Sequence, residues 1–188
     1  GFEAMVANFQ ATSQRIKYSL VPVVAAVRGL ALGGGCEFQM HSAKAVFALE
    51  SYIGLVEAGV GLLPAGGGLK EFAVRASEAA GPGGDVFAQL KTAFESVAMG
   101  KVSASAFEAK ELKLARGNDA VVFNAFGLLH IARHEALALA EGGYRPPLPA
   151  RRIQVAGGVG IATFKMLLVN MLGGRFGSAD DYEIASRI

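Results

Sequence analysis

Hydrophobic and polar positions follow one another in blocks that predict an alternation of helices and short buried strands. In Phe2–Tyr18 apolar residues recur near helical spacing with polar residues between them, which predicts an amphipathic helix. Val21–Val27 is a short apolar run rich in β-branched residues, and Ala45–Leu49 is another, so each predicts a buried strand. The helix-forming residues of Gly34–Ala43 lie between the two runs. The pattern therefore favours an α/β fold.

The rest of the chain is predicted to be mostly helical. Helical spacing continues over Leu69–Ala79, Val86–Met99 with Asp85 as its N-cap, Ser103–Leu114 with a capping serine, Asn124–Ala140, Ile161–Leu172 and the start of one more helix in Ser178–Ile188. A short strand is expected at Ala120–Phe123, and Gly142-Gly143 should end the helix before them.

Proline and glycine mark the boundary of the last region. Three prolines between Tyr144 and Pro149 predict an extended strap. Beyond it, glycines recur, and each interior glycine costs a helix about 1 kcal/mol against alanine. The tail should thus be weakly helical unless it packs on something. We expect a main domain over residues 1–149 and a helical C-terminal extension over 150–188.

Composition excludes several classes of protein. The chain has 188 residues, 52% of them hydrophobic, which is enough for a sizeable core, and no apolar run reaches the length of a membrane span. A single cysteine fits a reducing compartment, so the cytoplasm is the expected location. A formal charge of +2 with scattered Lys and Arg gives no basic face for nucleic acid. Arg151 and Arg152 could meet a phosphate, but a solvated patch is the commoner meaning of such a pair.

Candidate chemistry is concentrated between Val21 and Gly68. Gly33-Gly34-Gly35 falls between the predicted strand and helix, and Gly29 is also expected to turn the chain. Glycines at a helix start leave bare amides and a positive dipole end, which suits an anion or an oxyanion. Glu37 and Glu57 bracket this region in apolar sequence, and Glu57 is followed by a second glycine-rich turn, Pro64–Gly68. Burial would raise the pKa of both carboxyls toward the range of acid and base catalysis.

At these residues the sequence resembles the crotonase superfamily, the enoyl-CoA hydratases and isomerases. The words PVVAAVRGLALGGGCE and GLVEAGVGLLPAGGG carry the resemblance, with Val56 in place of a usual proline and Ala65 in place of a glycine. The resemblance implies a crotonase-like α/β fold of stacked ββα repeats. It also implies that the N–H of Gly34 is one of two oxyanion donors and that Glu37 and Glu57 handle water and protons. The substrate-binding residues it implies are Leu32, Gly33, Gly35 and Pro64.

The implied function is enoyl-CoA hydration in fatty-acid β-oxidation. The substrate would be an acyl-CoA thioester, with no cofactor and no metal. An isomerase of the same fold is an alternative, although it needs only one carboxylate. The segment GYRPPLP resembles the hydratase part of multifunctional 3-hydroxyacyl-CoA dehydrogenase/hydratase chains. Expected partners are therefore a fused or associated dehydrogenase domain or further copies of the chain, and no NAD site is expected in this segment.

The resemblance does not cover the family's first repeats, which include the loop with the second oxyanion N–H. We therefore expect this chain to be a fragment whose isolated form has no measurable hydratase activity and associates through exposed apolar surface. A non-catalytic structural or oligomerisation module of a larger enzyme is the second hypothesis.

Other reactive residue types have simpler interpretations. Cys36 follows the glycines, but no His stands at a diagnostic position, so we expect a packing residue. His41, His130 and His134 lack the spacing of a metal site. Five phenylalanines are expected in the core, because no basic residues interleave them as in a surface that stacks nucleic-acid bases; they are Phe47, Phe72, Phe87, Phe94 and Phe107.

Overall fold

A three-stranded parallel sheet forms the centre of the computed structural model, which describes residues 1–188. Its strands are β1 (Val24–Leu32), β2 (Lys44–Gly54) and β3 (Ala120–Val122), in the order β1-β2-β3. β2 is the middle strand and is buried over most of its length. Such near-continuous burial is typical of a parallel strand that is covered on both faces.

Helices surround the sheet and form a separate group on one side. The α-helices are α1 (Phe2–Lys17), α2 (Gly34–His41), α3 (Gly68–Ala80), α4 (Val86–Ala98), α5 (Ala106–Glu111), α6 (Leu128–Glu141), α7 (Gly157–Gly173) and α8 (Ala179–Ala185), and the short 3₁₀ helices are η1 (Glu57–Val60) and η2 (Ala125–Gly127).

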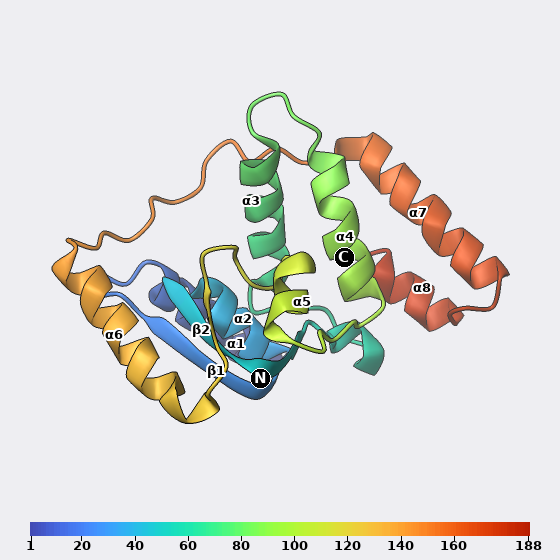
Figure 1. Ribbon diagram of the computed structural model, residues 1–188. Helices are drawn as coiled ribbons and strands as arrows, with labels where there is room; N and C mark the ends of the chain where they lie inside the picture. The colour runs from blue at the N-terminus through green and yellow to red at the C-terminus, as the bar shows by residue number, and fades with distance from the viewer.

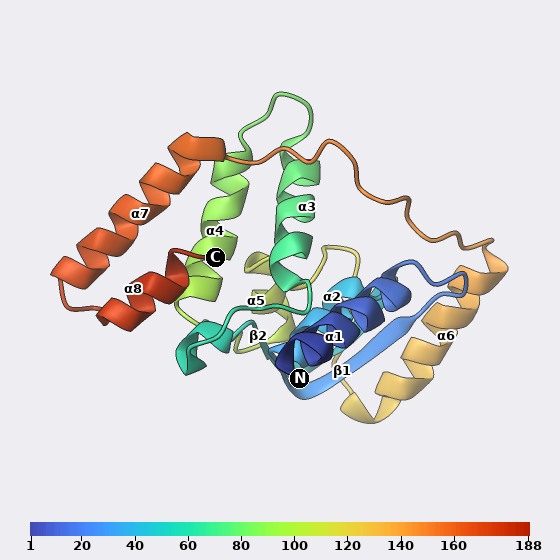
Figure 2. The same cartoon turned by 180° about the vertical axis from the view of Figure 1, so that it is seen from behind.

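The sheet lies between two helical layers. α6 packs against β1 and β2 on one face, and α2 packs on both strands from the other, with α1 outside α2 (Figures 1 and 2). α3 and α4 extend away from the sheet and meet α7 and α8, and a long strap from the end of α6 crosses to α7 (Figure 1). The elements that bear the candidate carboxylates thus lie where the sheet meets this helical group.

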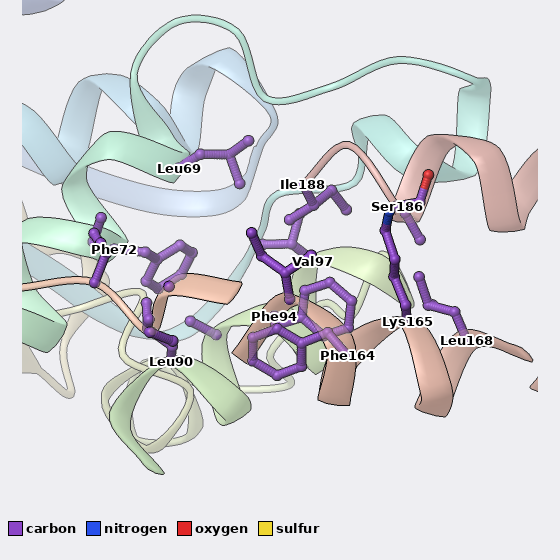
Figure 3. Close-up of a pocket in the computed structure, with 17 residues that line it drawn as sticks. Leu69, Phe72, Leu90, Phe94, Val97, Phe164, Lys165, Leu168, Ser186 and Ile188 are labelled. Carbon is purple, nitrogen blue, oxygen red and sulfur yellow. The ribbon is translucent and has the colours of Figure 1, made fainter. Parts of the chain in front are cut away.

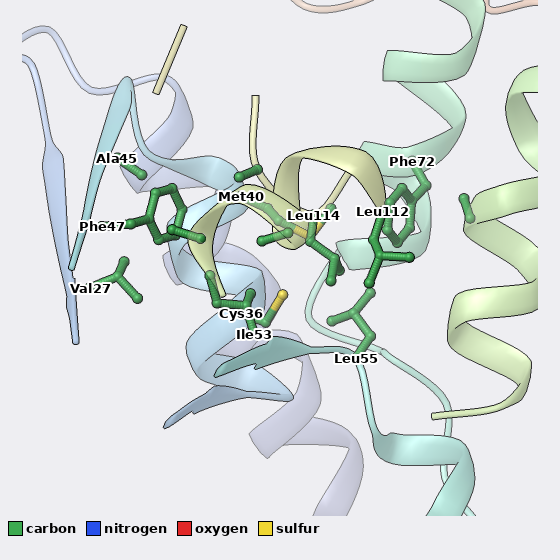
Figure 4. Packing of buried hydrophobic residues seen from close by; sticks show 14 of the residues in the cluster. Val27, Cys36, Met40, Ala45, Phe47, Ile53, Leu55, Phe72, Leu112 and Leu114 are labelled. Carbon is green, nitrogen blue, oxygen red and sulfur yellow. The ribbon is translucent and has the colours of Figure 1, made fainter. Parts of the chain in front are cut away.

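The main hydrophobic core is on the α2 side of the sheet (Figure 4). Phe47 of β2 and Met40 of α2 are fully buried in it, together with Ile53 and Leu55 from the end of β2 and Leu114 after α5. Burying side chains of this size is worth about 1.5–3 kcal/mol each, before the entropy of ordering them is subtracted. The helix that carries Glu37 is therefore fixed on a rigid base.

The first strand differs from its predicted range. β1 begins at Val24 and runs to Leu32, so Gly29 does not turn the chain as expected but lies inside the strand. The pairing of β1 with β2 shifts register between Val27 and Gly29, and Gly29 has a φ of 66°. A residue at positive φ within a strand marks a bulge, where glycine avoids the strain of a side chain. Gly29 therefore marks a β-bulge within β1 and not the turn that follows the strand.

The region around Glu57 also differs from the sequence interpretation. β2 continues to Gly54, well past the predicted end at Leu49, because its later residues remain buried against the core. The expected loop from Tyr52 to Gly61 therefore contains the end of a strand and the short helix η1, which begins at Glu57.

Two predicted helix signals are confirmed and two are refined. Asp85 caps α4 by accepting from the N–H of Ala88, and α6 ends just before Gly142. The serine that caps α5 is Ser105, whereas the hydroxyl of Ser103 accepts from the N–H of Ile53 and ties this segment to β2. The predicted helix from Asn124 begins with η2, which Asn124 caps.

The glycine-containing tail forms a helix because it packs on α4. Phe164 of α7 lies with its ring centroid 4.9 Å from that of Phe87 and 4.2 Å from that of Phe94, in stacked geometry. Aromatic pairs of this kind add about 0.5–1.5 kcal/mol each beyond the area they bury. This contact is the packing that the sequence required for a helix here.

None of the helices combines the length and the apolarity that crossing a lipid bilayer requires.

We expect Phe164→Ala to unfold α7 preferentially. The substitution removes both stacked contacts and should lower the free energy of unfolding by about 3 kcal/mol, with a loss of helical circular dichroism. Val169→Ala on the same helix, at a side chain 52% exposed, is the matched control. Equal effects of the two changes would show that α7 does not depend on the aromatic contact.

Candidate functional site

The first glycine turn joins the end of β1 to the start of α2. Gly33 has a φ of 52°, and its N–H donates to the carbonyl oxygen of Gly54 at 2.9 Å, which fixes the turn against the end of β2. A Cβ placed on Gly33 would lie 3.2 Å from Oε1 of Glu57. The bare backbone of this turn is thus in close contact with the second candidate carboxylate.

Glu37 lies in the first turn of α2 with only 2% of its surface exposed. Its Oε1 accepts a hydrogen bond from the N–H of Gly68 at 2.8 Å. Burial raises the pKa of the Glu37 carboxyl, while the amides of Gly68, Gly66 and Gly67 act in the opposite direction and favour the anion. A buried carboxylate that is also held by amides is suited to accept a proton near neutral pH.

Glu57 begins η1, and its pKa is also raised, chiefly by burial. Its Oε2 is buried and has no hydrogen-bond partner, while the backbone amides of Glu57 and Val56 oppose the effect of burial. The negative charge of Glu57 also raises the pKa of Glu37, but less than burial does. The site therefore contains two carboxyls in different environments, one held at the second glycine turn and one beside the first.

An aromatic ring from α1 covers the same space. The ring of Phe9 stacks obliquely on Phe38 of α2, with centroids 4.6 Å apart. A Cβ on Gly34 would lie 2.8 Å from Cζ of Phe9, and one on Gly66 would overlap both the Phe9 ring and Oε2 of Glu37. Glycine is therefore required at Gly66 by close packing. Phe9 forms an apolar wall over the first turn and over Glu37.

The other residues assigned to the site from sequence lie around this centre. Gly34 is the first residue of α2 and Gly35 follows it, half-buried and exposed respectively. The N–H of Gly34 makes no bond to a backbone acceptor in a turn or loop, which leaves it available as a donor. Leu32 ends β1, and Pro64 is buried at the start of the second glycine turn.

Cys36 is a core residue, as expected. It is fully buried, and burial raises the pKa of its thiol to about 12, so it is not a nucleophile. His41 is buried at the end of α2, whereas His130 and His134 lie on α6 with ring centroids 4.3 Å apart. No three His, Cys, Asp or Glu side chains gather in a geometry that could hold a metal ion.

An apolar cavity of about 330 Å³ lies between α3, α4, α7 and α8 (Figure 3). Of its 17 lining residues 14 are hydrophobic, and neither Glu37 nor Glu57 is among them. Leu69, which directly follows Gly68, is one of its walls. The cavity offers an apolar environment next to the site but brings no pair of reactive groups of its own.

Two features of the site were missed from sequence. The second glycine turn binds Glu37, although glycines ahead of a helix are a general signal for anion binding and could have indicated it. The position of Phe9 had no local signal, because its contacts are with residues of α2 and the second turn that are distant in the chain.

The raised pKa of Glu57 predicts that Glu57→Gln stabilises the chain at neutral pH. A carboxyl whose pKa is higher in the folded state contributes stability below its unfolded pKa of about 4.3, and this stability is lost as the pH rises through the folded pKa. At pH 7–8 the variant should thus melt at a higher temperature than the parent, and the difference should vanish by about pH 4. Thermal melts at both pH values test this, and a parent that melts at the higher temperature at pH 8 would contradict it.

Comparison with known proteins places this geometry in a family. The family model described as Enoyl-CoA hydratase/isomerase matches residues 3–112, which include both carboxylates and both glycine turns. A protein of Bacillus subtilis named probable 3-hydroxyacyl-CoA dehydrogenase is 39% identical over 184 residues, covering 98% of this chain and 23% of that protein. The chain therefore spans about a quarter of the length of this relative.

Solved structures agree in fold. The enoyl-CoA hydratase of Bacillus anthracis superimposes with a TM-score of 0.57 at 22% identity, covering 99% of this chain and 59% of the other. An enoyl-CoA hydratase of a Polaromonas species gives 0.56 at 20% identity, covering 99% and 60%. The predicted crotonase-like α/β fold is confirmed, and the chain belongs to the enoyl-CoA hydratase/isomerase family.

Proposed function

We propose that this chain carries the carboxylates of an enoyl-CoA hydratase, which adds water across the 2,3 double bond of a trans-2-enoyl-CoA thioester in fatty-acid β-oxidation. The observation that carries the proposal is the placement of two carboxyls at the two glycine turns: Glu37 accepts from the N–H of Gly68 at 2.8 Å, and Glu57 lies against Gly33, where a Cβ would be 3.2 Å from its Oε1. The coenzyme A thioester is the substrate, and the reaction needs no cofactor.

The different environments of the two carboxyls support different roles. Glu37 is stabilised as an anion by the N–H of Gly68, so it is the base toward water. Glu57 has an unpartnered buried oxygen and holds a proton more readily, so it delivers the proton to C2. As charge develops on the thioester oxygen, the N–H of Gly34 and the positive end of α2 stabilise it.

An isomerase that moves the double bond is the alternative within the family. It shuttles one proton between two carbons and needs a single carboxylate, whereas hydration must place both a water and a proton. The presence of two carboxyls, buried Glu37 on α2 and half-buried Glu57 on η1, therefore favours hydration. Assaying the same protein with trans-2-enoyl and cis-3-enoyl thioesters separates the two reactions.

The full-length protein is proposed to be multifunctional. The relative named as a dehydrogenase is about four times as long as the region it shares with this chain, which supports a fused dehydrogenase domain outside these residues. We propose a cytoplasmic enzyme that associates with further copies or with that domain. A non-catalytic structural or oligomerisation module of a larger enzyme is the other alternative, and it would turn over neither thioester in the same assay.

We expect Glu57→Gln in the full-length protein to lower the kcat of hydration by about 10²-fold or more, since a general acid contributes roughly that much. Affinity for the acyl-CoA should change only a few-fold, because the amide keeps the size of the carboxyl. Crotonyl-CoA hydration, followed by loss of enoyl absorbance, measures the rate. Glu50→Gln, at an exposed carboxylate on β2, is the control. A loss below fivefold at Glu57 would reject its assigned role.

Gly34→Ala should lower kcat by about 10²-fold while leaving the melting temperature close to that of the parent. The added Cβ would lie 2.8 Å from the tip of the Phe9 ring, which can move, but it would also crowd a thioester held by the Gly34 amide. Gly59→Ala in η1, where a Cβ would meet nothing within 4 Å, is the matched control. If Gly34→Ala mainly unfolds the protein, this glycine serves the turn and not the oxyanion.

A further inference from the structure

A buried polar cluster lies behind the site and joins three helices. Glu71 of α3 is 2% exposed, and its Oε1 lies 2.6 Å from Nζ of Lys17 at the end of α1 and 2.9 Å from Nζ of Lys70. Nε2 of His41, the last residue of α2, is 3.5 Å from the same oxygen. One carboxylate oxygen thus faces groups from α1, α2 and α3, and the reaction proposed above uses none of them.

The other ring nitrogen of His41 contacts the residue that carries the site. Nδ1 is 2.6 Å from the backbone carbonyl oxygen of Glu37. A carbonyl oxygen can only accept, so Nδ1 must bear the proton and donate. In the neutral ring Nε2 is then a bare lone pair, and it has no hydrogen-bond partner. The tautomer of His41 is fixed by the helix that holds Glu37.

The imidazole also separates the two parts of the site. A Cβ on Gly67 would lie 2.9 Å from both Cε1 and Nε2 of His41, so the second glycine turn packs directly on the ring. On one side the ring holds the carbonyl of Glu37, and on the other it contacts the turn whose Gly68 N–H binds the Glu37 carboxylate. The imidazole therefore lies between the carbonyl of Glu37 and the backbone of the second glycine turn, which it contacts through its edge atoms.

We propose that His41 and Glu71 are positioning residues, which hold the Glu37 turn of α2 at hydrogen-bonding distance from the Gly66–Gly68 turn. His41 acts as the spacer, and Glu71 fixes α3 against α1 and α2. The inference deepens the proposed function, because it concerns the base of that reaction, but its structural part stands without any turnover.

Burial is the main cause that lowers the pKa of His41. The hydrogen bond to the Glu37 carbonyl and the charge of Glu71 act in the opposite direction, and the positive charges of Lys70 and Lys17 lower the pKa further. Burial alone would raise the pKa of Glu71, but the same two lysines bring it below its ordinary value. Arg75 of α3 also faces the end of α2, donating to the carbonyl oxygen of Met40. Protonating His41 would add a cation to this cationic surrounding.

The deciding experiment is the titration of the Glu37 carboxyl by ¹³C NMR in the parent, His41→Leu and His41→Asn. Leucine keeps much of the volume but has no donor for the Glu37 carbonyl, so the two turns should separate and the Gly68 bond should weaken. Because that bond favours the anion, the pKa of Glu37 should rise in His41→Leu. Asn offers an N–H near the position of Nδ1 and should restore most of the parent value.

Kinetics give a second readout on the full-length protein. His41→Leu should lower kcat about 10-fold to 100-fold and shift the acid limb of its pH profile upward, with KM within about threefold. If the protein proves not to hydrate enoyl thioesters, the proposed function fails while the Glu37 titration still decides the positioning role. An unchanged Glu37 pKa in folded His41→Leu overturns it.

Lys17→Met provides a test should His41→Leu fail to fold. It removes a positive charge near His41 and frees Glu71 Oε1 to accept from Nε2–H, so the pKa of His41, followed by NMR of its ring, should rise. Lys44→Met is the matched control, since it removes a Lys–Glu contact of similar length, 2.7 Å to Glu135, between β2 and α6. If the pKa of His41 changes equally in both variants, or in neither, Lys17 and Glu71 do not act on His41 and the proposed role of the cluster is wrong.

Discussion

The hydrogen bond from the N–H of Gly68 to the carboxylate of Glu37 is the interaction on which the site depends. It joins residues 31 positions apart and connects the start of α3 to the first turn of α2. A buried carboxylate without such a donor would cost several kcal/mol or would take up a proton. The bond thus lets a charged group exist on the core side of the sheet, and the glycine turns and the buried cluster around it all affect its length.

The glycines of the two turns matter because they have no Cβ. Gly33 turns the chain beside Glu57, and Gly66 and Gly67 leave room for the Phe9 ring and the His41 ring. A side chain at any of the three would push apart groups that must stay within a few ångströms. Positive φ also favours glycine at Gly33 and Gly67, whereas at Gly66 the close approach of the Phe9 ring and the Glu37 carboxylate is the reason for it.

Sequence reasoning located the parts of the site whose signals are local. The two glycine turns and the two carboxylates stand within the stretch from Val21 to Gly68, and the family comparison covers all of them. Glycine 29 was assigned to a turn because composition alone cannot distinguish a turn from a bulge. The contacts of Phe9 and the pairing of Lys17 with Glu71 could not be predicted, since they join segments that meet only after α1 folds across α2.

Chemical labelling of the Cys36 thiol can report local opening of the packing around α2. This thiol is the only one in the chain, is fully buried, and has a pKa of about 12, so a reagent that attacks thiolates cannot reach or use it in the closed structure. Labelling must wait until the packing between α2 and the end of β2 opens. The labelling rate therefore measures the local opening free energy one residue away from Glu37, with no engineered probe.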